Sequence, residues 1–175
     1  MRRLLTKLFM FLFLDFVPYM RLGRKKFHLI LLKLYSKKIG VNLNFHYGVI
    51  FHGTSKTTFG NNIDIGNGSM LGMGGQECII GNNVMMGGDV KLITIEHGYK
   101  DKSIPMKLQK SIYSPIVIED DVWLGDGVKV ISGNKSVKIS KGIIVGAGSI
   151  VTKDLNIENG IYVGSPARFL KSRFE

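Results

Sequence analysis

The chain has 175 residues, 45% of them hydrophobic, which is enough for one domain with a sizeable core and excludes an intrinsically disordered protein. Glycine is frequent, at 22 residues, but no Gly-X-Y repeat occurs, so a collagen-like structure is also excluded. The only cysteine, Cys78, cannot form an internal disulfide and suits a reducing compartment, and we therefore expect a cytoplasmic protein.

The net charge of +11 is concentrated near the N-terminus. Residues 1–38 contain ten Lys or Arg and one acid, whereas residues 39–175 contain fourteen basic and twelve acidic residues. The main part of the chain is therefore nearly balanced in charge. The charge distribution does not indicate a nucleic-acid-binding protein, and we expect no nucleic-acid partner.

The first part of the chain is predicted to be a basic, apolar helical arm. Residues 4–17 are apolar on almost every side and stop before Pro18. Their uninterrupted apolar run, residues 8–14, is far shorter than the roughly 20 residues needed to span a bilayer. A signal peptide is not expected either, because Asp15 interrupts the apolar stretch and no small-residue cleavage site follows it.

A second helix is predicted over residues 27–38. Its apolar stripe consists of Phe27, Ile30, Leu31 and Leu34. One interpretation of the arm, residues 1–38, is a pair of interfacial helices that contact an anionic membrane peripherally. The other is a helical cap over the end of the main domain. The two interpretations are compatible, and the sequence leaves both open.

From residue 39 onward, large aliphatic or aromatic residues recur at every sixth position, a period that is typical of neither strands nor α-helices. The successive sets are Ile39, Phe45 and Phe51; Phe59, Ile65 and Leu71; Ile80, Met86 and Leu92; Ile118, Leu124 and Val130; and Ile139, Val145 and Val151, with the step continuing through Ile157 and Val163. Turn formers such as Asn61-Asn62 and Asp126-Gly127 lie between them and tolerate the positive φ of a sharp corner.

Each six-residue unit is therefore predicted to be one short strand and one corner. Three units close a triangular coil of about eighteen residues, and coils stack at a strand spacing of about 4.8 Å. A single coil cannot bury its inner face, so the stack as a whole forms the core.

The register of this repeat gains two, three, twenty and three residues between successive sets, each time after the third unit. The gains therefore fall on one corner of the predicted prism, and insertions in solenoids often collect on the edge that binds a ligand. The largest gain, residues 98–117, begins directly after His97 in the stretch ITIEHGYKD. We expect His97 to stand at the mouth of the largest loop.

Four stretches resemble a known family: IGNNVMMGGDV (80–90), PIVIEDDVWLGDGVKV (115–130), VGAGSIVTKD (145–154) and VGSPARFLK (163–171). Together with the six-residue period, they resemble the hexapeptide-repeat acyltransferases over roughly residues 38–173. The most similar members are the maltose/galactoside-type O-acetyltransferases, within the branch that modifies bacterial surface polysaccharides such as capsule or lipopolysaccharide.

The resemblance implies an all-β fold, a left-handed parallel β-helix of about five coils. It also implies an N-terminal helical arm (1–38), a β-helix domain (39–163) with an excursion loop (98–117), and a short C-terminal tail (164–175). The left-handedness comes from the resemblance alone, because parallel crossovers are generally right-handed.

The same resemblance implies a homotrimer that uses acetyl-CoA as co-substrate and transfers the acetyl group to a carbohydrate acceptor, with His97 as catalytic residue. Neutral imidazole, with an ordinary pKa near about 6.5, can take the proton of a sugar hydroxyl as its oxygen attacks the thioester directly. Glu96 or Asp101 could orient the ring, and the sequence does not choose between them. The developing oxyanion requires a backbone N–H, which Gly87 or its neighbours could supply.

The resemblance also implies a set of acetyl-CoA contacts: Gly87, Trp123, Asp126, Ala147, Thr152, Lys153, Arg168 and Lys171. The small residues would let pantetheine lie along a flat face, and the basic residues would meet the coenzyme's phosphates. By phase, Trp123 points outward, which indicates a ligand wall or ordinary packing between subunits.

Some features depart from the family pattern or leave alternatives. The segment GMGGQECI (72–79) lacks the polar residues with which galactoside enzymes hold their sugar, so a galactoside is not the expected acceptor. No histidine follows His97, so a zinc-dependent γ-type carbonic anhydrase is rejected and no metal is expected. An N-acetyltransferase acting on an amino sugar nucleotide remains the alternative. A non-enzymatic membrane-associated scaffold would explain the arm but not His97 or Trp123.

Overall fold

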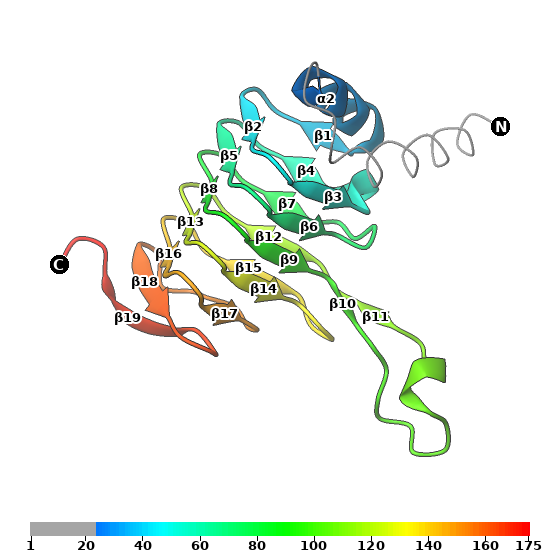
Figure 1. Ribbon diagram of the computed structural model, residues 1–175. Coiled ribbons are helices and arrows are strands. Elements are labelled where there is room, and N and C mark those ends of the chain that lie inside the picture. Colours follow the sequence, from blue (N-terminus) through cyan, green and yellow to red (C-terminus); the bar gives the residue numbers. More distant parts are fainter. Residues whose placement is uncertain (1–23) are drawn as a thin grey trace.

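The computed structural model describes residues 24–175 as a parallel β-solenoid with three faces (Figure 1). Face A contains β1 (Lys38–Ile39), β4 (Thr58–Phe59), β7 (Ile79–Ile80), β12 (Ile116–Ile118) and β15 (Val137–Ile139). Face B contains β2 (Leu43–Phe45), β5 (Ile63–Ile65), β8 (Met85–Met86), β13 (Trp123–Leu124), β16 (Ile144–Val145) and β18 (Gly160–Val163), with β19 (Arg168–Ser172) added antiparallel at the end. Face C contains β3 (Ile50–His52), β6 (Met70–Gly72), β9 (Lys91–Ile93), β14 (Lys129–Ile131) and β17 (Ile150–Val151). The chain visits the faces in the order A, B, C and then crosses one corner to start the next coil.

The interior is built from the residues of the six-residue period. On face A, Phe59 pairs with Ile80 and Ile80 pairs with Ile118, and all three side chains are fully buried. The other faces repeat this arrangement, so each coil covers the apolar surface of the coil before it. The predicted period and its inward positions are confirmed from Phe45 to Val151.

The prediction is wrong for the last coil. Ile157 and Val163 are exposed, at 51% and 37%, and do not continue the core. Leu155 takes the inward position on face A through a bridge to Ile139, and Tyr162 takes it on face B. The reason is that the spacing of the inward residues changes here. Leu155 follows Val151 by four residues and Tyr162 follows Leu155 by seven, so counting onward in steps of six loses the register.

The corner between faces A and B is held by polar side chains that bond from one coil to the next. The backbone N–H of Asn61 donates to the side-chain oxygen of Asn82 at 2.9 Å, and the N–H of Asn82 donates to Asp120 at 2.7 Å. The following residues, among them Asn62 and Asn83, adopt positive φ near 55°. Asn tolerates this conformation, which explains why turn formers recur at the corner.

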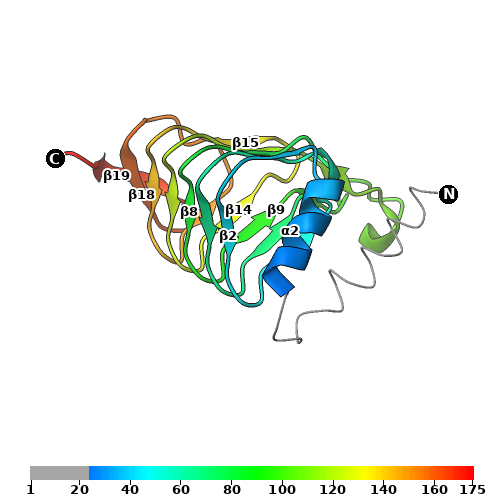
Figure 2. The ribbon, with the colours of Figure 1, turned by 90° about the horizontal axis from the view of Figure 1, so that it is seen from above.

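Helix α2 (Arg24–Tyr35) covers the first coil (Figure 2). Over residues 26–35 of the helix, the buried side chains are those of Leu31 and Leu32, and Leu32 belongs to the core. The predicted stripe is therefore only partly right, because Ile30 and Leu34 are 55% and 73% exposed. The helix lies across the open end of the solenoid. The spacing of its apolar residues therefore did not predict which of them face the first coil. The prediction for residues 4–17 lies outside the described residues.

Two other boundaries differ from the prediction. The solenoid resumes at Ile116, so the last two residues of the expected loop 98–117 belong to β12. Part of the expected C-terminal tail forms β19, which pairs with β18.

In residues 24–175, no helix is long and apolar enough to cross a membrane.

Candidate functional site

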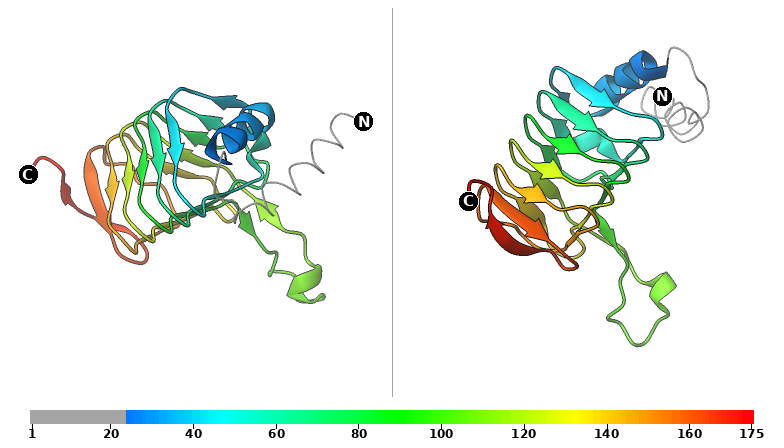
Figure 3. Two further views of the ribbon diagram at one scale, coloured as in Figure 1. Left: turned by 45° about the horizontal axis from the view of Figure 1, so that its top comes forward. Right: turned by 60° about the vertical axis from the view of Figure 1, so that its left-hand side comes forward.

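The insertions all leave the solenoid at the corner between faces C and A, as the register gains predicted. This corner carries the short 3-10 helix η1 (Thr54–Lys56), the segment 73–78, the excursion after β9, and the segment 132–136. The excursion begins as an antiparallel hairpin of β10 (Ile95–Glu96) and β11 (Ile112–Tyr113) and projects far from the prism (Figures 1 and 3). His97 is the first residue after β10.

Buried hydroxyl groups anchor the stem of the hairpin. Thr94 is fully buried, and its side chain donates to the Gly72 carbonyl at 2.9 Å. On the returning strand, the carbonyl of Ser114 accepts a hydrogen bond of 2.6 Å from the Ser132 hydroxyl. These bonds fix both ends of the hairpin to neighbouring coils, and His97 lies only three residues from Thr94.

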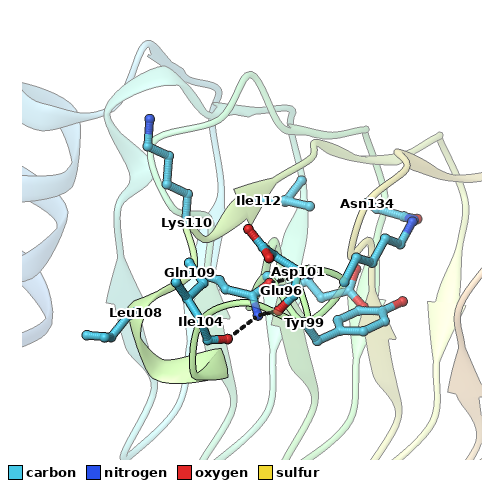
Figure 4. A pocket seen from close by; sticks show the side chains of 11 residues that line it. Glu96, Tyr99, Asp101, Ile104, Leu108, Gln109, Lys110, Ile112 and Asn134 are labelled. Atoms are coloured by element: carbon cyan, nitrogen blue, oxygen red, sulfur yellow. Dashed lines mark hydrogen bonds between the residues drawn. The ribbon is translucent and has the colours of Figure 1, made fainter.

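The tip of the excursion is held by Gln109. Its side-chain amide donates to the carbonyls of Asp101 and Ile104, at 2.8 and 3.1 Å, and its side-chain oxygen accepts from the Asp101 N–H (Figure 4). The tip also contains the 3-10 helix η2 (Met106–Leu108). The excursion is therefore an ordered finger rather than an irregular loop.

Two hollows lie against this hairpin. We call the first the charged groove; its volume is about 480 Å³ and its lining is Glu96, Gly98, Tyr99, Lys100, Asp101, Ile104, Leu108, Gln109, Lys110, Ile112 and Asn134 (Figure 4). We call the second the aromatic hollow; its volume is about 460 Å³ and its lining is Tyr35, His52, Gly53, Met70, Gly72, Gly74, Gly75, Ile93, Ile95 and Tyr113. Both volumes are in the range of small-molecule sites.

His97 is exposed and, within residues 24–175, makes no hydrogen bond or ion pair to a side chain. The carboxylate of Asp101 accepts hydrogen bonds from the hydroxyl and the N–H of Ser103, and these bonds lower the pKa of Asp101. The Glu96 carboxylate lies above Gly133, where an added Cβ would be 2.8 Å from its Oε2. Neither acid therefore holds the imidazole in this conformation.

Trp123 points outward from face B and is 46% exposed, as the phase predicted. Its cross-strand neighbours on the same face are Met85 and Ile144. Face B is opposite the corner from which His97 projects, because that corner joins the other two faces. One chain alone cannot bring Trp123 and His97 together.

Three of the predicted coenzyme contacts lie on the corner between faces B and C: Gly87, Asp126 and Ala147. The suggested oxyanion role of Gly87 is wrong, because its N–H already donates to the Leu124 carbonyl at 2.8 Å. The next amide, that of Gly88, donates to the Asp126 carboxylate. Asp126 thus repeats the bonding found along the other corner, which gives it a structural role.

The remaining predicted contacts lie further along the solenoid. Thr152 and Lys153 are exposed on the same corner as His97, two coils later. Arg168 and Lys171 are exposed on β19. In the described part of the chain, none of the three basic residues forms an ion pair with an acid. Their charge is therefore available to an anionic ligand.

The sequence interpretation missed the aromatic hollow. Tyr35, His52 and Tyr113 are far apart in the sequence and meet only through the stacking of coils. The signal that could have revealed it is the run of glycines at 72, 74 and 75, since a glycine at an outward strand position leaves an opening in a wall of side chains. Among residues 24–175, no group of three or more His, Cys, Asp or Glu could hold a metal ion.

The curated proteins with similar sequences include several acetyltransferases, and the solved structures with a similar fold include acetyltransferases and an N-acyltransferase. A galactoside O-acetyltransferase of Lactococcus lactis subsp. lactis is 33% identical over 125 residues, which are 70% of this chain and 50% of that protein. A hexapeptide-repeat acetyltransferase of Vibrio cholerae, solved in complex with acetyl coenzyme A, is 25% identical with a TM-score of 0.73 over 91% of this chain and 82% of its own. A maltose O-acetyltransferase of Clostridium difficile shares the fold, with 24% identity and a TM-score of 0.69 over 97% of this chain and 83% of its own.

These likenesses support the hexapeptide-repeat acetyltransferase family. Within it, the chain is similar to the maltose/galactoside O-acetyltransferases. The predicted left-handed β-helix is confirmed, with about six turns where about five were expected. No family model matches the chain. The chain spans about half the length of the curated relatives that it matches.

Proposed function

We propose that this protein is an acetyl-CoA-dependent O-acetyltransferase that acts on a sugar hydroxyl of a bacterial surface polysaccharide or its precursor. The observation that carries the proposal is an exposed imidazole, His97, on an anchored hairpin of a solenoid that resembles an acetyl-CoA-bound acetyltransferase. A base in this position can accept the proton of the attacking hydroxyl.

In the proposed reaction the sugar oxygen attacks the thioester carbonyl while His97 takes its proton. A bond forms between the sugar oxygen and the acetyl carbon, the carbon–sulfur bond breaks, and the imidazolium returns the proton to the departing thiolate. Ala147 is small and exposed, so it leaves room for an extended chain at the corner between faces B and C. At Gly87 the place of the missing side chain is taken by Asp126 of the next coil. Lys153, Arg168 and Lys171 supply positive charge for phosphate groups.

We propose that the active site lies between subunits of a homotrimer. Trp123 on face B and His97 on the opposite corner can line one cleft only if they come from neighbouring chains. Met85 and Trp123 are exposed, Ile144 beside them is half-buried, and together they offer an apolar surface for such packing.

N-acetylation of an amino sugar nucleotide is the second candidate. The charged groove favours it, because Glu96 and Asp101 could receive an ammonium group and Lys100 and Lys110 could receive phosphate. The two reactions need the same base and the same coenzyme, so the acceptor distinguishes them.

The test is the release of coenzyme A from acetyl-CoA with neutral sugars and with amino sugars. We expect His97→Ala to lower turnover about 10²- to 10⁴-fold, as loss of a general base does. The matched control is His46→Ala, because His46 lies on the first coil and bonds to Asp64 at 3.1 Å. Light scattering should show the same oligomer for both variants. Wild-type turnover in His97→Ala would refute the assignment.

We also propose a cytoplasmic protein whose arm, residues 1–38, contacts the anionic inner face of the cell membrane. The proposal rests on the ten basic residues of the arm and the apolar stretch 4–17. Sedimentation with vesicles containing phosphatidylserine should fall when residues 1–23 are deleted. Helix α2 must be kept in this experiment, because Leu32 belongs to the core.

A further inference from the structure

The end of the solenoid that carries α2 is strongly basic. Between Asp15 and Asp64 the sequence contains eight Lys or Arg and no acidic residue. Residues 64–175, in contrast, contain thirteen basic and twelve acidic residues. The excess positive charge of the described chain is therefore concentrated at one end of the prism, around α2 and the first coil.

The side of α2 that faces away from the first coil combines apolar and basic side chains. We call this side the outer stripe; it consists of Lys26, Ile30, Lys33 and Leu34, all of which are exposed. Their spacings of three and four residues place them on one side of the helix. Figure 2 shows α2 lying across the first coil, with its other side turned away from the solenoid.

The two lysines of the outer stripe are not neutralised by nearby acids. Within residues 24–175, Lys26 and Lys33 form no ion pair. Lys37, just after the helix, lies 3.6 Å from the Glu77 carboxylate, but both side chains are more than half exposed, so this ion pair neutralises little. The surface around α2 therefore favours an anionic partner.

The first coil adds two apolar side chains at the same end. Val41 lies at the corner between faces A and B, Tyr47 lies at the corner between faces B and C, and each is 65% exposed. No coil precedes this one, so neither corner is covered by a further turn of the solenoid (Figure 1). Exposed apolar side chains among lysines are typical of surfaces that bind at the boundary of an anionic membrane.

We propose that the outer stripe of α2, together with the corners at Val41 and Tyr47, docks on an anionic lipid bilayer; this inference rests on the proposed membrane contact of the arm and deepens it. Ile30 and Leu34 enter the boundary between headgroups and acyl chains, while the lysines remain at the lipid phosphates. A nucleic acid would use the lysines but not the exposed apolar side chains. A second copy packed on the same stripe would bring like charges together.

This docking determines how far the proposed base stands from the membrane. His97 follows β9 in the third coil, and two coil spacings amount to about 10 Å. Helix α2 adds about 10 Å, the diameter of a helix with its side chains. With the prism standing on its first coil, His97 is held about 20 Å from the lipid surface, so the proposed acetyl transfer takes place close to the membrane.

The test is sedimentation of the full chain with phosphatidylcholine vesicles, with and without phosphatidylserine. We expect binding to require the anionic lipid and to weaken as the salt concentration rises. Ile30→Gln combined with Leu34→Gln should weaken binding about tenfold or more, because both side chains lose their burial in lipid. The matched control combines Ile157→Gln with Leu170→Gln, since these side chains are similarly exposed, at 51% and 58%, but lie at the other end of the solenoid. This control should bind as the wild type does.

A second pair of variants tests the charge. Lys26→Gln combined with Lys33→Gln should weaken binding about 30-fold, at about fivefold for each lysine near the lipid surface. Lys102→Gln combined with Lys107→Gln removes the same charge from the exposed tip of the excursion and should change binding little. Hydrogen–deuterium exchange with vesicles present should show protection in residues 24–53 and none in β19.

The proposal is overturned if the double variant of Ile30 and Leu34 binds as the wild type does, or if the control at the other end loses as much. Abolished binding in Phe11→Gln with Phe13→Gln, beside intact binding in the α2 variants, would assign the contact to the stretch 4–17 alone. The broader membrane proposal would then stand and the docking of α2 would not. No binding of the wild type to anionic vesicles would overturn both.

Two measurements without lipid distinguish other occupants of the outer stripe. A changed oligomer in the double variant of Ile30 and Leu34, seen by light scattering, would mean that the stripe packs on another copy. A clearly lowered melting temperature would mean that it packs within the chain, and either result overturns the proposal. The acetyl transfer is judged separately, by coenzyme A release from a soluble acceptor with His97→Ala, so its failure is not confused with failure of docking.

Discussion

Mixing two inactive variants should restore activity if the active site is shared between subunits. The two variants are His97→Ala and Trp123→Ala, and each leaves the other residue intact. His97 projects from the corner between faces A and C, whereas Trp123 is exposed on face B, the face opposite that corner. A site that uses both must take His97 from one chain and Trp123 from the next.

The expected magnitude follows from the threefold symmetry of the proposed homotrimer. A site is intact only where a Trp123→Ala subunit, which keeps His97, precedes a His97→Ala subunit, which keeps Trp123. Every mixed trimer, whether it has one or two copies of either variant, contains one such junction. Purified mixed trimers should therefore recover about one third of the wild-type rate. If both residues served a site within one chain, no subunit would be intact.

The assay needs two affinity tags, one on each variant. Mixed trimers are isolated by successive purification on the two tags and compared with each parent and with the wild type for coenzyme A release. Activity no higher than the mean of the two parents would refute the shared site. Wild-type activity in Trp123→Ala alone would remove Trp123 from the site altogether.

Two further predictions concern stability. Leu124 is fully buried between Met86 and Val145. Leu124→Ala should lower the free energy of unfolding, measured by urea denaturation, by about 2–5 kcal/mol. A loss below about 1 kcal/mol would mean that the neighbouring coils close over the cavity. The pKa of Asp120 is lowered by hydrogen bonds from the backbone and then the side chain of Asn82, so its stabilising effect is present above its ordinary pKa and is lost as the pH falls through the lowered value. Asp120→Asn keeps an acceptor for the Asn82 N–H, and the decrease in its melting temperature from pH 7 to pH 3 should be smaller than that of the wild type. An equal decrease would contradict this assignment.

The fold was predictable because its period is local and repetitive. Equivalent inward positions of successive coils, such as Ile65 and Leu124, have the same buried environment. The spacing of apolar residues in the sequence therefore predicts which side chains are buried. Prediction failed where neighbours differ from those in the repeat. The last coil has a shorter corner and an antiparallel strand beside it, and α2 packs on an end of the solenoid rather than within it.

The candidate site was predictable only in part, for a related reason. The register gain after His97 marks the corner from which the hairpin leaves, and that information is contained in the spacing alone. The aromatic hollow is different, because Tyr35, His52 and Tyr113 come from a helix, a first-coil strand and the returning strand of the hairpin. No local sequence pattern predicts that these three residues lie close together. The sequence likewise did not predict the hydrogen bond from the Gly87 amide to the Leu124 carbonyl of the next coil.

The arrangement separates what must stay fixed from what can vary. Each coil contacts only its neighbours. An insertion at the corner between faces C and A therefore leaves unchanged both the buried apolar residues and the hydrogen bonds between coils at the corner between faces A and B. The stem of the hairpin is nevertheless tied to the prism by Thr94 and Ser114, which bond to the coils before and after it. His97 lies next to this anchored stem rather than at the tip. The position of His97, the proposed base, is therefore set by the solenoid, while the length and composition of the excursion can vary without disturbing it.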